Sequence, residues 1–171
     1  LAAIAVGVAP DEYSQTEAAN SGLVGVRKYL RKNPPHTLHQ RAMLLWASSY
    51  LDGLMSREQQ KQCVDELEAL QLDDGGWSLA TLGDWKRSDN KTQDLENSDG
   101  YGTGFVVYVL LRAGRERNDP NIQRGIAWLK SHQRESGRWF TRSLNKDSKH
   151  YISHAGSAMA IMALAECETL P

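Results

Sequence analysis

Hydrophobic residues follow two patterns along this chain, and both have the spacing of α-helices. Three segments place their apolar residues three or four positions apart, on one face: residues 21–32, 57–70 and 120–133. Three others leave little polar face: residues 38–54, 99–113 and 153–166. Helices covered on one side and helices covered on both sides alternate when a chain builds two concentric helical layers. The pattern therefore predicts an all-α arc of outer and inner helices.

The limits of these segments carry signals of helix ends. Ser21, Asp99 and Asp119 are the predicted N-caps, because their side-chain oxygens can accept hydrogen bonds from the first free backbone N–H groups of a helix. Residues 1–8 have the character of an inner helix that has been cut through, and the chain does not begin with Met. We therefore expect residues 1–171 to be a single segment of a longer chain.

Two stretches between the helices show no helical period. Residues 78–97 are polar, and loops of this length in compact domains are often lids or binding loops. Residues 140–151 form a second expected loop. The helix between the two loops begins with Gly100, Gly102 and Gly104, each of which costs helix stability by ~1 kcal/mol relative to Ala. These glycines indicate either the close approach of another backbone or open space for a ligand.

A short motif, Q-x-x-x-G-x-W, occurs twice, each time at the end of an amphipathic helix. The first copy is Gln71, Gly75 and Trp77, and the second is Gln133, Gly137 and Trp139. Two copies built alike, each with a leucine four residues before the glutamine, indicate a repeat protein. We expect all six residues to be structural, with the amide bonding backbone groups at helix ends and the indole contributing buried area.

The second copy, in its fuller form, resembles the QW repeat of squalene and hopene cyclases. The residues that carry the resemblance are Arg124, Gly125, Leu129, Gln133, Gly137 and Trp139. The earlier copy departs from the pattern, with Gln62 and Cys63 where Arg-Gly is expected. The resemblance implies an α/α toroid, a fold shared with protein prenyltransferase β subunits, in which the glutamine ties one outer helix to the start of the next. We expect a partial ring of about three inner/outer helix pairs.

The resemblance to cyclases raises the question of a proton donor. Those enzymes use a D-x-D-D motif, and its counterpart here is the tetrad QLDD at residues 71–74, which lacks the first aspartate and lies inside the structural turn. Protonating an alkene requires an unusually strong carboxylic acid, which a shared carboxylate cluster supplies. The sequence offers no other such cluster, so we do not expect cyclisation by this segment alone.

The resemblance to prenyltransferases raises the question of zinc. Those proteins hold the metal with D-x-C at the start of one inner helix and a His at the start of the next. Asp99 and His154 match two of these positions, but Tyr101 replaces the cysteine. Gln93 and Glu96 replace the basic residues that grip the diphosphate. A catalytic zinc ion has three protein ligands, so we expect no metal or other cofactor, with zinc at Asp99 and His154 as the alternative.

Several side chains remain as candidates for contact with a ligand. Tyr101, Phe105 and Tyr108 lie at i, i+4 and i+7, a stripe that binds apolar chains or cations in some sites and forms ordinary core in others. Arg142, in the second loop, could meet an anion near the start of the last helix. The candidate cavity residues are therefore Asp99, Tyr101, Phe105, Tyr108, His154 and Arg142.

Composition narrows the range of partners. The net charge of −1 gives no electrostatic reason to expect nucleic acid, and no apolar run approaches the ~20 residues of a transmembrane helix. Cys63 and Cys167 lack metal-type spacing and are expected to be buried apolar residues. The partners that we expect are an apolar or isoprenoid small molecule, and the rest of its own chain or a second copy that completes the ring.

Three functions fit these observations. The first is a squalene cyclase- or prenyltransferase-like repeat domain that binds a ligand or partner without complete catalytic motifs. The second is a part of a terpenoid (triterpene) cyclase or prenyltransferase-type enzyme whose catalytic half lies outside this segment. The third is an arc that assembles with another copy. We favour the first and expect that this segment alone is not an enzyme.

Overall fold

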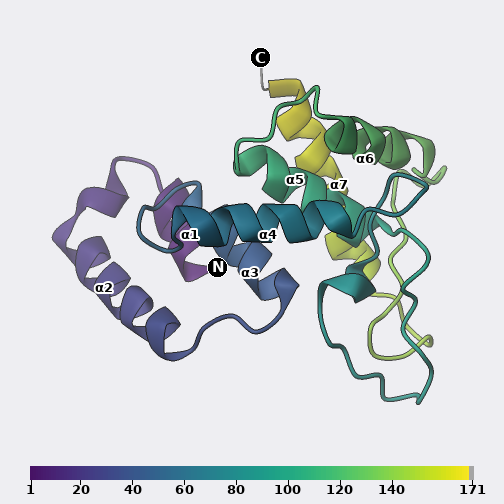
Figure 1. Cartoon of the computed structure of the whole chain (residues 1–171), viewed down its shortest axis with the longest axis horizontal. Coiled ribbons are helices and arrows are strands. Elements are labelled where there is room, and N and C mark those ends of the chain that lie inside the picture. Colours follow the sequence, from purple (N-terminus) through teal and green to yellow (C-terminus); the bar gives the residue numbers. More distant parts are fainter. Residues whose placement is uncertain (170–171) are drawn as a thin grey trace.

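The computed structural model describes residues 1–169, which form seven α-helices, two short 3₁₀ helices and no β-strand (Figure 1). The α-helices are α1 (Ala2–Val8), α2 (Glu17–Lys32), α3 (Leu38–Ser48), α4 (Arg57–Ala69), α5 (Gly100–Arg112), α6 (Pro120–Ser131) and α7 (Ile152–Thr169). The 3₁₀ helices are η1 (Tyr13–Gln15) and η2 (Leu79–Leu82). The prediction of an all-α fold is confirmed. None of the described helices is long and apolar enough to cross a bilayer.

The helices form two layers. The inner helices α1, α3, α5 and α7 are neighbours in chain order, and the outer helices α2, α4 and α6 each pack on the inner helix that precedes them. Figure 1 shows α4 lying along α3, and α6 beside α5 and α7. This arrangement is an arc of three inner/outer pairs with α7 as a further inner helix, as the sequence predicts.

Helix α5 is the centre of the main hydrophobic core. Every residue from Gly102 to Leu111 is buried. A Cβ atom on Gly104 would lie 2.5 Å from the backbone nitrogen of Ala160 in α7, and one on Gly102 would lie 2.5 Å from the backbone nitrogen of Leu79. Because no side chain fits at these two positions, the glycines serve the close approach of other backbones rather than open space for a ligand.

Two predicted helix ends are wrong. Helix α2 begins at Glu17, four residues before the expected N-cap Ser21, because Thr16 caps it by accepting a hydrogen bond from the backbone N–H of Ala19 at 3.2 Å. Helix α3 ends at Ser48 rather than at residue 54. The hydroxyl of Ser48 bonds the helical carbonyl of Leu44 at 2.9 Å, and such bonds compete with the regular helical pattern.

The expectation of all-round burial holds only for α5. Helix α3 exposes Gln40 and leaves Trp46 half-buried, and α7 exposes 58% of Ile161. Helix α7 has an inner neighbour only on its α5 side among the described residues, and the inner neighbour of α3 opposite α5 is the short, seven-residue α1, so neither helix is covered as completely as α5. Residues of α1, α2, α3 and the turn after α3 form a second, smaller core, which includes Leu23 and Leu51.

The two Q-x-x-x-G-x-W turns have the same hydrogen bonds. The indole N–H of Trp77 donates to the carbonyl of Leu67, and that of Trp139 donates to the carbonyl of Leu129, both at 2.7 Å. Both indoles are buried, with exposed fractions of 0% and 2%. Gly75 has a φ of +91°, in the left-handed region that favours glycine. Gly137 adopts the same region, with a φ of +76°.

The glutamines of the two turns differ in their partners. The Gln71 amide donates to the carbonyl of Gly75 in its own turn and to the carbonyl of Asn121 in the first turn of α6, both at 2.8 Å. Its oxygen accepts from the guanidinium of Arg124. The Gln133 amide is exposed and donates to the carbonyl of Gly137 at 3.0 Å. Gln71 therefore links α4 to α6, the link that the resemblance implies.

Candidate functional site

Asp99 is the N-cap of α5 and lies where several elements meet. Its Oδ1 atom accepts hydrogen bonds from the backbone N–H groups of Tyr101 and Gly102, both at 2.9 Å. The same atom accepts from the hydroxyl of Thr141 at 3.0 Å. Its Oδ2 atom accepts from the backbone N–H of Leu79 at 2.6 Å. The carboxylate thus joins α5 to the loops that precede and follow the α5–α6 hairpin.

The environment of Asp99 changes its acidity. Burial raises the pKa of the carboxyl to about 6, although its hydrogen bonds act in the opposite direction. A small cavity of about 70 Å³ lies beside it, lined among others by Arg142 and Phe140. This volume holds a few water molecules at most, so it is no pocket for an isoprenoid chain.

Tyr101 belongs to a cluster of four ring side chains from α3, α5 and the first loop, which we call the aromatic cluster: His39, Trp85, Tyr101 and Phe105. The Tyr101 hydroxyl lies 3.0 Å from Nε2 of His39. The His39 ring stacks on Phe105 at a centroid distance of 4.8 Å and meets Trp85 edge-on at 5.8 Å. Burial lowers the pKa of His39, which favours the neutral ring.

The predicted aromatic stripe is divided between this cluster and the core. Phe105 is fully buried, and Tyr108 is 6% exposed and packs edge-on against Trp46 at 5.1 Å. Burial, followed by the neighbouring Tyr50, raises the pKa of Tyr108 beyond its usual range. Tyr101 and Trp85 are half-buried, so they present the accessible edge of the cluster.

The two long loops hold each other in place. The side chain of Arg87, only 1% exposed, donates to Asp89 at 2.6 and 2.8 Å and to Asp147 at 2.7 Å. Arg142 also bonds Asp147, at 2.8 and 2.9 Å. These bonds lower the pKa of both carboxyl groups, with Arg142 the first cause at Asp147 and Arg87 at Asp89. The charge of Arg142 therefore has a partner within its own loop.

No described hydrogen bond or ring contact joins His154 to the other candidates. His154 is exposed in the first turn of α7, where its backbone N–H bonds the carbonyl of Tyr151 at 3.0 Å. The described contacts of Asp99 do not include it. Among the described residues, no group of three His, Cys, Asp or Glu side chains is arranged to hold a metal ion.

Asp74, of the tetrad that corresponds to D-x-D-D, has structural partners. It accepts hydrogen bonds from the hydroxyl of Ser98 at 2.6 Å, from the backbone N–H of Gly76 at 3.0 Å and from the indole of Trp128 at 2.9 Å. Burial by itself raises the pKa of Asp74, but these three bonds together outweigh burial and lower it. At neutral pH the Asp74 carboxyl is therefore ionised and has no proton to give to an alkene.

The sequence does not predict three residues that organise the site. His39 is a polar residue near the start of a helix whose later turns are mostly apolar, and Trp85 is an aromatic residue in a polar loop. Each was therefore a weak signal of a special contact. Arg87 gave none, because its partner Asp147 lies in a different loop and no local pattern connects the two.

Comparison with known proteins gives the family. The chain matches the squalene-hopene cyclase C-terminal domain over residues 41–166. A squalene-hopene cyclase of Schizosaccharomyces japonicus (strain yFS275 / FY16936) is 42% identical over 43 residues, which cover 25% of this chain and 6% of that protein. No solved structure matches the chain. Since the family match covers most of the chain, this protein belongs to the squalene-hopene cyclase C-terminal domain family.

Proposed function

We propose that this chain is a binding module of a terpenoid cyclase-like ring. It holds an isoprenoid chain against the aromatic cluster and does not itself supply the acid that starts cyclisation. The observation that carries the proposal is the accessible edge of that cluster, where Tyr101 and Trp85 are half-buried and the Tyr101 ring lies 5.7 Å, between centroids, from the fully buried Phe105 ring. Aromatic faces and edges bind apolar chains through their large contact area.

The acidic groups of the chain support a binding role rather than proton donation. Asp74 is held in its ionised form by three hydrogen bonds. Asp99 accepts four hydrogen bonds, two of them from the backbone of α5, so its oxygens are occupied by the fold. A general acid must reach the atom that it protonates, and Asp99 is instead turned into the protein.

Titration with farnesol, an uncharged isoprenoid alcohol, tests this proposal. We expect saturable binding by calorimetry, with tryptophan fluorescence changed through Trp85. Tyr101→Ala should weaken binding about tenfold, because the accessible ring is lost. Tyr101→Phe keeps the ring and loses only the hydroxyl bond to His39, so its affinity should stay close to that of the natural protein.

Tyr151→Ala is the matched control, since Tyr151 is 68% exposed and lies outside the cluster. Absence of saturable binding, or equal affinity in Tyr101→Ala and Tyr151→Ala, would reject the binding role. Circular dichroism spectra of all variants must first show the natural helix content, so that lost affinity is not lost folding.

The second candidate is that the module forms part of a catalytic terpenoid cyclase whose acid lies outside these residues. The family match favours it, as does the name of the curated relative, squalene-hopene cyclase. Incubation of the full-length protein with squalene, followed by analysis of the products, separates the two candidates. A cyclised product that is lost in Tyr101→Ala and kept in Tyr151→Ala would replace the simple binding role with a catalytic one.

A further inference from the structure

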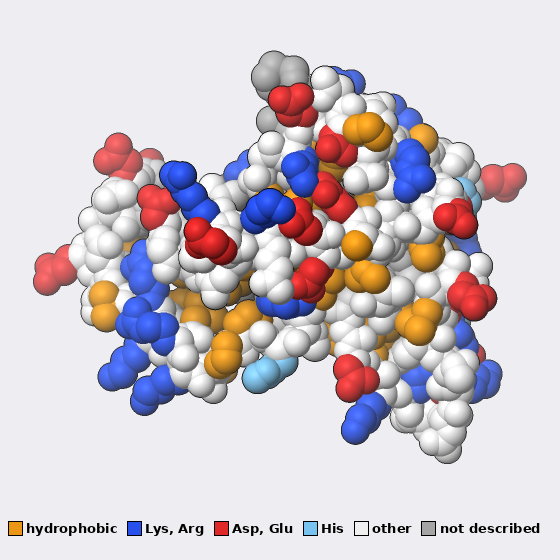
Figure 2. Space-filling model, viewed as in Figure 1, with side chains coloured by type: hydrophobic (Ala, Val, Ile, Leu, Met, Phe, Trp, Pro, Cys, Tyr) orange, Lys and Arg blue, Asp and Glu red, His pale blue; other side chains and the backbone are white. Residues whose placement is uncertain are grey.

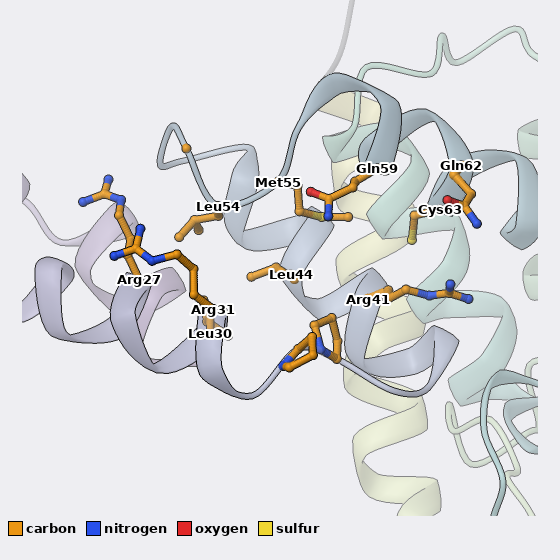
Figure 3. A pocket seen from close by; sticks show the side chains of 13 residues that line it. Arg27, Leu30, Arg31, Arg41, Leu44, Leu54, Met55, Gln59, Gln62 and Cys63 are labelled. Atoms are coloured by element: carbon orange, nitrogen blue, oxygen red, sulfur yellow. The ribbon is translucent and has the colours of Figure 1, made fainter.

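A second cavity of the molecule contains none of the four residues of the aromatic cluster. A cleft of about 490 Å³ separates the C-terminal half of α2 from the α3–α4 hairpin (Figure 3). We call it the basic cleft and define it by six of its lining residues: Arg27, Leu30, Arg31, Arg41, Leu44 and Leu54. Its volume is within the range of about 300–1,000 Å³ that is typical of small-molecule sites.

The charged side chains of the cleft are all cationic. Its described lining contains three arginines and no acidic residue. Arg41 extends away from the other two in Figure 3 and pairs with Glu66. Arg27 donates to the backbone carbonyl of Asp52 at 3.0 Å, which fixes its position, and no described residue forms an ion pair with it. Arg31, one turn further along α2, has no acidic partner among the described residues.

The wall opposite these two arginines is apolar. Figure 3 shows Leu44, Leu54 and Met55 across the gap from α2. Leu30 and Leu44 are both half-buried, yet they belong to neither of the two hydrophobic cores. Figure 2 shows hydrophobic side chains exposed beside the Lys and Arg side chains of α2. Apolar surface next to uncompensated positive charge is the pattern that an amphipathic anion matches.

We propose that the basic cleft binds a single-chain amphipathic anion. Its phosphate or carboxylate head lies on Arg27 and Arg31, whose planar guanidinium groups suit both anions. Its acyl or prenyl chain lies on Leu30, Leu44 and Leu54. Arg41 also lines the cleft, but its guanidinium is paired with Glu66, so we assign the head group to Arg27 and Arg31 alone.

Local helix stability accounts for only one of the two cleft arginines of α2. Basic residues in the last turn of a helix are stabilised by the helix dipole, and Arg31 and Lys32 are placed there. Arg27 lies outside that turn. Two like charges at i and i+4 also destabilise a helix, so the pair costs stability that a bound anion would recover.

Calorimetric titration with four probes tests the proposal: geranyl diphosphate, decanoate, geraniol and inorganic pyrophosphate. We expect one binding site per chain for geranyl diphosphate or decanoate. The probe that binds with the lower Kd shows whether the cleft prefers a phosphate or a carboxylate head. Geraniol lacks the anion and pyrophosphate lacks the chain, so each should bind about tenfold more weakly. Binding of the charged probes should weaken as salt is added.

Two double variants of α2 provide a matched pair. Arg27→Gln with Arg31→Gln should weaken binding of the charged probe about tenfold or more. Lys28→Gln with Lys32→Gln makes the same change in net charge, but neither lysine lines the cleft, so the affinity should stay within about threefold. Equal losses in the two pairs would overturn the proposal, since they would show attraction by overall charge alone.

Further outcomes would also overturn the proposal. Pyrophosphate that binds as tightly as geranyl diphosphate would show a simple anion site. Binding to phosphatidylserine vesicles without binding to any soluble probe would show a membrane surface instead. Tyr101→Ala should leave the affinity of the basic cleft unchanged, because the ring lies outside it. The test of this site is thereby separate from the test of the aromatic cluster.

Discussion

Gln71 and Gln133 occupy the same place in the two repeat turns but have different partners, so alanine variants measure what the link between hairpins contributes. Gln71 makes three kinds of contact: with Gly75 in its own turn, with Asn121 in α6 and with the guanidinium of Arg124. Among the described residues, Gln133 bonds only the carbonyl of Gly137. The two variants remove the same side chain from the same local geometry.

The contacts set the expected magnitudes. A protein hydrogen bond contributes about 0.5–1.5 kcal/mol net, and more when one partner is charged. Gln71→Ala loses three such contacts in a half-buried place, so we expect a loss of about 2–3 kcal/mol in the free energy of unfolding. Gln133→Ala loses one exposed bond, and exposed substitutions of this kind usually change stability by no more than about 0.5 kcal/mol.

Urea denaturation followed by far-ultraviolet circular dichroism measures both losses, with the midpoint and slope fitted separately. A double-mutant cycle of Gln71→Ala and Arg124→Ala isolates their mutual contact, for which we expect a coupling of about 1 kcal/mol. Losses that agree within about 0.5 kcal/mol for the two glutamines would refute the reasoning. Such agreement would mean that the turn, and not the link to α6, accounts for the contribution of the glutamine.

Two further predictions concern the buried indoles and one buried acid. Trp77→Ala and Trp139→Ala should each lower the free energy of unfolding by about 3–5 kcal/mol in urea denaturation, because both rings are fully buried. Trp77→Phe should lower it more than Trp46→Phe, because of these two indole N–H groups only that of Trp77 has a described partner. For Asp99, burial raises the pKa from 3.8 to about 6. Between about pH 4 and pH 6, the folded state therefore binds a proton that the unfolded chain lacks. As pH falls through that window, the Asp99 carboxyl stabilises the fold by on the order of 2 kcal/mol. Asp99→Asn should remove this pH-dependent part, and a stability difference between the two proteins that does not change from pH 4 to pH 7 would contradict it.

The sequence predicts most of the fold because the signals of the fold are local. The caps at Asp99 and Asp119 are the observed starts of α5 and α6, since a capping side chain bonds backbone groups within three residues. The repeat turns are equally local. The missed start of α2 has the same kind of cause, because Thr16 competes with Ser21 as a cap and only the structure shows which one is used.

The site is less predictable because its contacts join distant parts of the chain. The hydroxyl of Tyr101 meets His39, and the guanidinium of Arg87 meets Asp147. No periodicity connects such pairs. The spacing of the aromatic stripe puts Tyr101, Phe105 and Tyr108 on one helix, but the sequence does not show which of these rings remain accessible. That depends on neighbours: Phe105 is covered by the ring of His39, while Tyr101 stays half-buried.

The two repeats also show which part of the stability is internal to a hairpin. Trp77 and Trp139 are equally buried and bond carbonyls of their own hairpins, although α5 has inner neighbours on both sides and α7 exposes Ile161. The glutamines differ because Gln71 has a following outer helix to bond and Gln133 has none among the described residues. In repeat proteins, stability is approximately a sum of such internal terms and terms between neighbours. The indole hydrogen bonds therefore belong to the internal term. The bond of Gln71 to Asn121 and the close packing of the Trp77 ring on Gly125 of α6 belong to the coupling term. A further hairpin packed on α7 would bury Ile161 and give Gln133 its second partner, while leaving the indole bond of Trp139 as it is.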